Sequence, residues 1–173
     1  MRWTVHGERT LYDSDWMRLT LVDVELPSGT RFEQHVVRFP APASATVVRD
    51  PERGILLLRR HRFTVDTFGW EVPAGRADAG ESPEDAARRE TTEETGWRPG
   101  PLRSLGSFHP MPGPVDQTFH LFVAEGAEQV GGPDEDEAPI VEWKRVDEVR
   151  RLMRDGSITD GLSLVALYRA LGE

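Results

Sequence analysis

The segment Gly75–Trp97 decides the fold and reads GRADAGESPEDAARRETTEETGW. It begins as a glycine-containing loop and continues as a short helix whose second half carries Glu90, Glu93 and Glu94. Because successive residues of an α-helix are rotated by about 100°, these three side chains share one face. Like charges at such spacings destabilise a helix by a few tenths of a kcal/mol per pair. A cation shared by the carboxylates would remove the repulsion, so the pattern predicts a metal site.

The segment resembles the sequence signature of the Nudix hydrolases, enzymes that cleave a nucleoside diphosphate linked to another group. The matching positions are Gly75, Glu81, Arg89, Glu90, Glu93, Glu94 and Gly96. The chain departs at Thr91, where the family prefers an aliphatic residue, and we expect this to be a packing position. Trp97, at another aliphatic position, is still apolar. The resemblance runs from about Asp15 to the end of the chain and implies an α/β/α sandwich with a mixed β-sheet.

Length and composition bound what the protein can be. The 173 residues predict one domain, 1–173, with a sizeable core. The net charge of −9 argues against a nucleic-acid partner, which needs a basic surface. The absence of cysteine excludes disulfides and thiolate zinc sites. The sequence has no apolar run of a signal peptide or of a membrane span, so we expect a cytoplasmic protein without a membrane partner.

Outside the motif the sequence alternates between strand and turn patterns. Residues 17–26 and 31–39 alternate apolar and polar side chains around Pro27–Gly29, which predicts an antiparallel β-hairpin within residues 1–40. Residues 41–173 then form the predicted catalytic core. Further strands are expected at 45–48, 55–59, 105–108, 118–124 and 141–145. The uninterrupted apolar run Ile55–Leu58 is typical of a strand buried on both faces.

Helix boundaries carry explicit signals. Ser82 is the expected N-cap of the motif helix, Pro83 its first residue and Gly96 its end. A second helix is expected from a cap at Asp147, and a last amphipathic helix from Asp160. Residues 125–139 are acidic and contain Gly and Pro, which predicts a loop.

The resemblance implies a metal site made of the motif's acids. Mg²⁺ prefers hard oxygen ligands, and Mn²⁺ is an expected substitute. Glu90 and Glu94, one helical turn apart, can hold the same ion, and Glu93 can take a second ion or bridge the two. In resembling enzymes the carbonyl before the motif's glycine completes the coordination, and here that residue is Ala74. Arg89 is expected to orient the acids, and the loop acid Glu81 to bind the metal or to support its ligands.

The flanks of the motif resemble the ADP-ribose pyrophosphatase branch. There the acid that matches Glu71 helps to hold the substrate, and Arg62 matches an arginine that we expect to contact a substrate phosphate. Arg60 and His61 depart from the Gln-Tyr of that branch. Pro112 and Gly113 lie where ADP-ribose-hydrolysing relatives carry a proline. On residue type alone, Arg62 could equally be an exposed arginine at a strand end, and Pro112 an ordinary loop proline.

The acidic run Asp134–Glu137 resembles a mobile segment that supplies the catalytic base in this branch. Glu137 is the first choice for that base and Glu135 the second, because a loop can close to bring a carboxylate to the attacking water. A solvated run of charges is an equally good interpretation. At position 117 the branch often has an acid, whereas this chain has Gln117, which cannot bind a metal as an anion.

The motif and the resemblance together predict Mg²⁺-dependent hydrolysis of the pyrophosphate bond in ADP-ribose or a related nucleotide sugar, with a small nucleotide as substrate. Relatives with this N-terminal hairpin are often dimers, so the resemblance also implies a homodimer. Two alternatives stay open. The chain could be a catalytically weak nucleotide-sensing module, or a Nudix enzyme that acts on flavin adenine dinucleotide or on dinucleoside polyphosphates.

Overall fold

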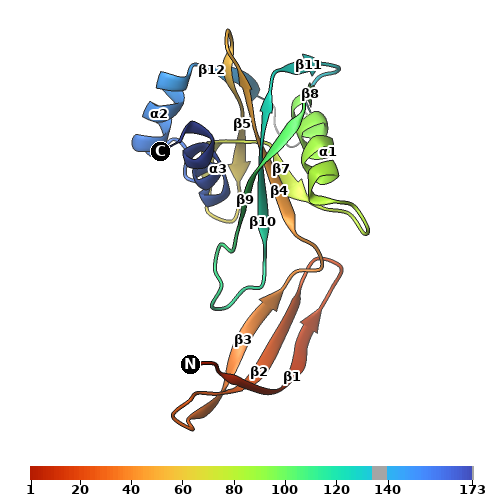
Figure 1. Ribbon diagram of the computed structural model, residues 1–173, viewed down its shortest axis with the longest axis vertical. Coiled ribbons are helices and arrows are strands. Elements are labelled where there is room, and N and C mark those ends of the chain that lie inside the picture. The colour runs from red at the N-terminus through yellow and green to blue at the C-terminus, as the bar shows by residue number, and fades with distance from the viewer. Residues whose placement is uncertain (134–139, 173) are drawn as a thin grey trace. The chain divides into compact units, whose positions relative to one another are not determined.

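The computed structural model describes residues 1–133 and 140–172 (Figure 1). The chain divides into two compact units. The first comprises Met1–Pro42 and His109–Thr118, and the second comprises Ala43–Phe108 and the chain from Phe119 onward. The expectation that residues 1–173 form one domain stays a prediction.

The first unit is built on a three-stranded antiparallel sheet in the order β1–β2–β3. Its strands are β1 (Thr4–Asp13), β2 (Arg18–Glu25) and β3 (Arg31–Arg38). The predicted hairpin is confirmed as β2 and β3, which join through a turn where Gly29 has a φ of 87°. The hairpin prediction omits β1, which pairs with β2. All ten residues of β1 are exposed, so no alternation of buried and exposed positions marks this strand in the sequence.

The loop 109–118 belongs to this first unit because its backbone is bonded to the end of β3. The Val37 amide donates to the Pro114 carbonyl at 2.8 Å, and the Asp116 amide donates to the Val37 carbonyl at 3.1 Å. The Asp116 carboxylate also accepts from the Phe39 amide at 2.9 Å. Residues distant in sequence are thus joined by two backbone hydrogen bonds and by one bond to the Asp116 side chain.

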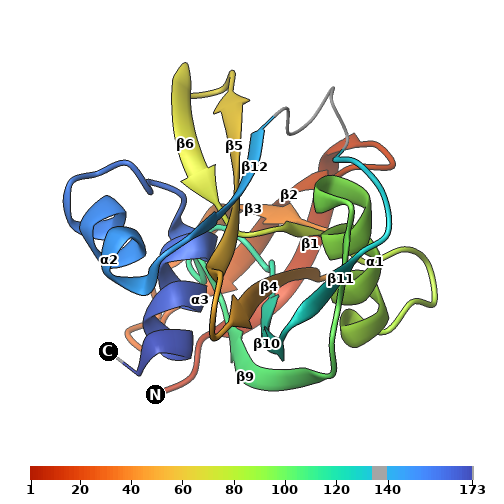
Figure 2. The ribbon, with the colours of Figure 1, turned by 90° about the horizontal axis from the view of Figure 1, so that it is seen from above.

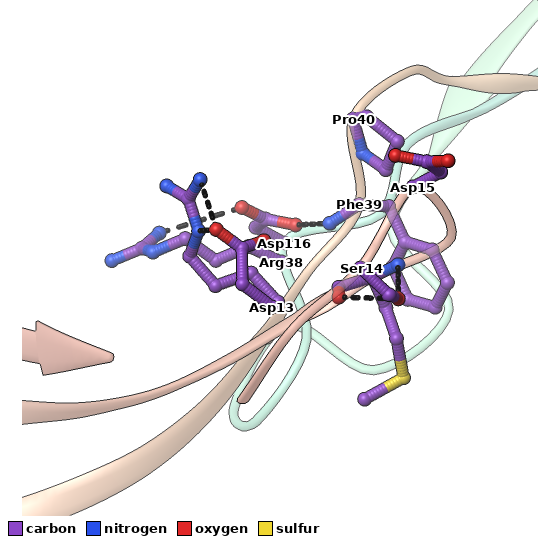
Figure 3. A pocket seen from close by; sticks show the side chains of 9 residues that line it. Asp13, Ser14, Asp15, Arg38, Phe39, Pro40 and Asp116 are labelled. Atoms are coloured by element: carbon purple, nitrogen blue, oxygen red, sulfur yellow. Dashed lines mark hydrogen bonds and ion pairs between the residues drawn. The ribbon is translucent and has the colours of Figure 1, made fainter. Parts of the chain in front are cut away.

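A cavity of about 830 Å³ opens at this junction within the first unit (Figure 3). Its two arginines are already paired with carboxylates, Arg18 with Asp13, and Arg38 with Glu8 and Asp116. None of the site residues predicted from the sequence lines it. Although it is large, this cavity is not the candidate active site.

The second unit contains the remaining strands and all the helices of the described chain (Figure 1). Its strands are β4 (Ala43–Asp50), β5 (Gly54–Arg62), β6 (Thr67–Glu71), β7 (Ala74–Arg76), β8 (Trp97–Pro99), β9 (Leu102–Phe108), β10 (Phe119–Glu125), β11 (Ala127–Gln129) and β12 (Ile140–Lys144). Its helices are α1 (Pro83–Thr95), α2 (Val146–Arg154) and α3 (Gly161–Leu171).

The main sheet of this unit is mixed, as the resemblance implied. Its order is β12–β5–β4–β10–β9, with β6 added to β5 and β7 added to β4. Among the strand pairs of this sheet in the described residues, only β4 and β10 run parallel. Figure 2 shows α1 on one side of this sheet and α2 and α3 on the other. The predicted α/β sandwich is therefore confirmed.

Both faces of the sheet are packed, and β5 shows this most directly. Ile55, Leu56, Leu57 and Leu58 have no exposed surface. Ile55 and Leu57 belong to a cluster that includes residues of α2 and α3, whereas Leu56 belongs to a separate cluster with partly buried Trp97 and Trp143. Alternate side chains of a strand point to opposite faces, so an uninterrupted apolar run is what a central strand requires.

The ends of α1 are set by the residues that the sequence predicted. The Ser82 hydroxyl accepts from the Asp85 amide at 3.1 Å, and Pro83 occupies the first turn, where no amide is needed. Gly96 ends the helix in the left-handed conformation, with a φ of 74°. Thr91 is fully buried, and its hydroxyl donates to the Ala87 carbonyl at 2.6 Å. A threonine is thus tolerated at this packing position because its polar atom has a partner inside the helix.

Two details of the second unit differ from the sequence predictions. Arg145, not Asp147, is the N-cap of α2, and in the described part of the chain no side chain makes a capping hydrogen bond to that helix. Asp147 lies within its first turn, where its negative charge interacts favourably with the positive end of the helix dipole. The region predicted as a loop from residue 125 contains β11, which pairs with β8 next to the end of α1. The predicted start of the last helix at Asp160 is confirmed, and Asp160 is the N-cap of α3. None of the helices in the described part of the chain is long and apolar enough to cross a membrane.

Candidate active site

Helix α1 presents the three glutamates of its second half at graded depth. Glu94 is buried, with 4% of its surface exposed, Glu90 is half-buried, and Glu93 is largely exposed. The gradation arises because residues 90 and 94 point toward β7, while residue 93 lies at the outer edge of the same face. The three acids share one helix sector, but only two of them are enclosed by the protein.

The backbone of β7 lies directly against the two enclosed acids. The Ala74 amide donates to Glu94 Oε2 at 2.9 Å. At Gly75 an added Cβ would lie 2.0 Å from Glu90 Cδ and 2.2 Å from Glu90 Oε1. The absence of a side chain at Gly75 leaves the space that the Glu90 carboxylate occupies. Glu90 and Glu94 therefore meet the chain at two consecutive residues, Ala74 and Gly75.

Arg89 forms hydrogen bonds with three acids of the motif, Glu81, Glu90 and Glu93. Its Nε and Nη2 donate to the two oxygens of Glu81 at 3.0 and 2.9 Å. Its Nη1 donates to Glu90 Oε1 at 2.8 Å and to Glu93 Oε2 at 3.0 Å. These bonds raise the pKa of Arg89, with Glu81 as the largest cause, and Arg89 in turn lowers the pKa of Glu81. The contacts are those expected of a residue that orients acids, and the functional role itself stays a prediction.

A second group of charges extends from Glu94 along β5 and β6. Arg60 Nη2 donates to Glu94 Oε1 at 2.5 Å, and Arg60 Nε lies 3.7 Å from Glu71 Oε2. Arg62 donates to both oxygens of Glu71, at 2.9 and 2.5 Å, which raises the pKa of Arg62. The charges thus alternate in the order Glu94, Arg60, Glu71, Arg62. The two residues predicted to hold substrate, Arg62 and Glu71, are each other's bidentate partners.

Burial dominates the electrostatics of Glu94. Loss of solvent raises the pKa of this carboxyl to about 7, against the opposing effects of Arg60 and of the Ala74 amide. The negative charge of Glu90 raises it further. A carboxylate in this setting is stabilised by any additional cation nearby.

The donor set of these residues fits a hard divalent ion in kind. Carboxylates and a backbone carbonyl are the ligands that Mg²⁺ and Mn²⁺ take, and Glu90, Glu94 and the chain at Ala74 are already adjacent. Within residues 1–133 and 140–172, however, no three acids or histidines surround one point. In this structure the positive charge beside Glu90, Glu93 and Glu94 is supplied by Arg89 and Arg60.

Two hollows of the second unit adjoin these charges. A cavity of about 290 Å³ is lined by Arg62, Glu71 and residues at the start of α3. A more open groove of about 460 Å³ is lined by Glu81, Arg89 and Glu93 along the outer side of α1. The first hollow is thus lined by the Arg62–Glu71 pair and the second by the more exposed residues of the motif, and Glu90 and Glu94 line neither of the two.

The other predicted residues lie elsewhere. Pro112 and Gly113 belong to the loop of the first unit, so their substrate role stays a prediction. Glu135 and Glu137 lie outside the described residues. Arg60 is the residue that the sequence pattern left without a role. The available signal was the alternation along the strand, which places Arg60 on the same face as the buried side chains of Leu56 and Leu58.

Comparisons with known proteins show the family of the chain. Residues 39–161 match the family described as NUDIX domain. A CMP-5'-(N-acetyl-N-hydroxy-3-aminopropyl)phosphonate hydrolase of Streptomyces rubellomurinus is 43% identical over 173 residues, covering 99% of this chain and 84% of that protein. An ADP-ribose pyrophosphatase of Bacillus subtilis is 31% identical over 164 residues, covering 93% of this chain and 88% of that protein.

Among solved structures, one described as an ADP compounds hydrolase has a TM-score of 0.81 and 21% sequence identity. It covers 99% of this chain and 94% of that one, which establishes a shared fold.

Proposed function

Since the chain belongs to the Nudix family and is a pyrophosphohydrolase of that family, we propose that it hydrolyses ADP-ribose or a related nucleotide sugar. The observation that carries the proposal is the placement of Glu90 and Glu94 against Ala74 and Gly75, with the Arg62–Glu71 pair at the edge of the same site. Water attacks one phosphorus of the diphosphate, and AMP and a sugar phosphate leave.

The proposed cofactor is Mg²⁺, with Mn²⁺ as a substitute. Glu90, Glu94 and the Ala74 carbonyl would hold it, and Glu93 would take a second ion or bridge the two. Bound metal neutralises phosphoryl oxygens and lowers the pKa of a coordinated water. Arg89 keeps Glu90 and Glu93 oriented through the bonds described above.

Substrate binding is assigned to residues beside the acids. Arg62, with its side chain about half exposed, would donate to a substrate phosphate while Glu71 holds its guanidinium in place. Pro112 and Gly113 are proposed to contact the substrate, as the resemblance implies. Glu137, or else Glu135, is proposed as the base that takes a proton from the attacking water.

The proposal is tested with a panel of ADP-ribose, GDP-mannose, flavin adenine dinucleotide and diadenosine polyphosphates, with product identification. In Mg²⁺ we expect AMP and ribose 5-phosphate from ADP-ribose. In excess EDTA we expect turnover to fall by at least about a thousandfold and to return on addition of Mn²⁺. Equal turnover with and without EDTA would contradict the metal assignment.

A CMP-linked phosphonate is the second candidate substrate, because the 43% identical relative bears the name of a hydrolase for such a compound. Its phosphorus–oxygen–phosphorus linkage presents the same chemistry to the acids as a diphosphate does. Adding a CMP-phosphonate to the panel separates the two. Release of CMP at a kcat/KM far above that for ADP-ribose would replace the first candidate with this one.

We also propose that the protein is a homodimer joined through the sheet of the first unit. Large apolar side chains are exposed on or next to β1, with exposed fractions of 51% for Trp3, 63% for Val5 and 57% for Tyr12. Such a patch favours association with a second copy. Sedimentation equilibrium should give twice the chain mass, and the double variant Val5→Glu, Tyr12→Glu should be monomeric. A wild-type monomer at micromolar concentration would exclude the dimer.

A further inference from the structure

Arg60 is a buried cation in the middle of the site. Its side chain is 8% exposed, and it lies between the carboxylates of Glu94 and Glu71, which are 5% exposed each. Arg62 pairs with Glu71 from the outer side. Of the two arginines in this row of charges, Arg60 forms the ion pair with Glu94, whereas Arg62 pairs with Glu71.

Both oxygens of Glu94 are engaged. Oε1 accepts from Arg60, and Oε2 accepts from the Ala74 amide. A buried carboxylate without a cationic partner is strongly unfavourable, and here Glu90 adds a second negative charge nearby. In this structure Arg60 therefore supplies the positive charge beside Glu94 that a bound divalent ion would otherwise supply.

Arg60 and a divalent ion would then compete at Glu94. The lone pairs that face Arg60 are less available to a metal, and the two positive centres repel each other across a poorly screened interior. A neutral side chain at position 60 could donate a hydrogen bond to Glu94 without repelling the metal ion.

We propose that Arg60 is a built-in counter-ion for Glu94, which holds the acid cluster together without metal and lowers the affinity of the site for divalent ions. The inference rests on the proposed use of Glu94 as a metal ligand. It makes Arg60 a positioning residue that sets metal affinity, not one that touches substrate.

The test measures Mn²⁺ binding to the whole chain by isothermal titration calorimetry, together with thermal unfolding in EDTA and in saturating Mn²⁺. Arg60→Gln should bind Mn²⁺ roughly tenfold more tightly than the wild type. Its Tm in EDTA should fall, while the rise in Tm caused by Mn²⁺ should grow. Arg59→Gln is the matched control, because Arg59 is the exposed neighbour on β5 and lies over the Phe68 ring. It should leave both quantities unchanged.

Arg60→Lys is a second variant that keeps the positive charge at position 60. It allows the inference to be tested even if Arg60→Gln does not fold. It should bind Mn²⁺ with nearly wild-type affinity. The inference is overturned if Arg60→Gln binds no more tightly than the wild type, or if Arg60→Lys binds as tightly as Arg60→Gln. A wild-type protein that binds no Mn²⁺ at millimolar concentration would overturn the proposed function as well, so the two failures are distinguishable.

Discussion

Glu94→Gln is expected to lower kcat by roughly three orders of magnitude, the largest effect of any single substitution considered for this protein. The amide keeps the shape of the side chain and can still accept from the Ala74 amide, whose bond to Oε2 is 2.9 Å long. It removes the charge that would bind a metal. The loss should therefore fall on catalysis while the backbone of β7 keeps its place.

The matched control is Glu84→Gln on the same helix. Glu84 is exposed and forms an ion pair with Arg88 at 3.4 Å. It lies in the first turn of α1, on a different helix face from Glu90 and Glu94. Its removal should change kcat/KM by less than about twofold, because exposed ion pairs contribute little. Far-ultraviolet circular dichroism of both variants checks the fold. If Glu94→Gln turned over ADP-ribose or the CMP-phosphonate as the wild type does, the catalytic assignment would fail and the nucleotide-sensing alternative would gain support.

Gly75→Ala is expected to lower kcat by about a hundredfold while changing stability little. The new Cβ would lie 2.0 Å from Glu90 Cδ, so the carboxylate has to move. Because that carboxylate is the far end of a flexible side chain, the backbone need not shift, and the cost in unfolding free energy should stay near 1 kcal/mol. The displaced carboxylate would also lose its bond to Arg89 Nη1, now 2.8 Å long. A displacement of about 1 Å in a catalytic group is sufficient for a hundredfold loss.

Gly131→Ala is the control for this second substitution. It lies in the same unit, and an added Cβ there would meet no atom within 4 Å. Urea unfolding and steady-state kinetics on both variants separate stability from activity. An unchanged kcat in Gly75→Ala would mean that the position of Glu90 does not matter for turnover. A loss of several kcal/mol in stability would mean that the glycine serves packing instead.

The elements with local signals could be predicted from the sequence. The Ser82 cap, the Pro83 start and the Gly96 end of α1 depend on residues within the helix termini, and the structure confirms each. The buried run Ile55–Leu58 is confirmed for the same kind of reason, since a strand covered on both faces needs apolar side chains at every position.

The elements that lack a local signal could not be predicted. β1 forms because β2 offers it a row of hydrogen-bonding groups, and its exposed residues carry no periodic pattern. β11 is three residues long and exists through its pairing with β8. The start of α2 at Val146 has no side-chain cap to mark it. In these three places the residues of the element carry no local pattern that marks it in the sequence.

The sequence by itself determined the family, the position of α1 and the identity of the acids, because a motif of fixed spacing on one helix is a local property. Only the tertiary structure decided how those acids differ. Packing of α1 against β7 buries Glu94, places Glu90 in the space above Gly75 and leaves Glu93 at the edge. The fold also places Arg60 of β5 in contact with Glu94 of α1, although the two residues are 34 positions apart in sequence. The sequence specifies the charge and the spacing of the acids. Their burial and their ion pairs depend on which surfaces come into contact when the chain folds.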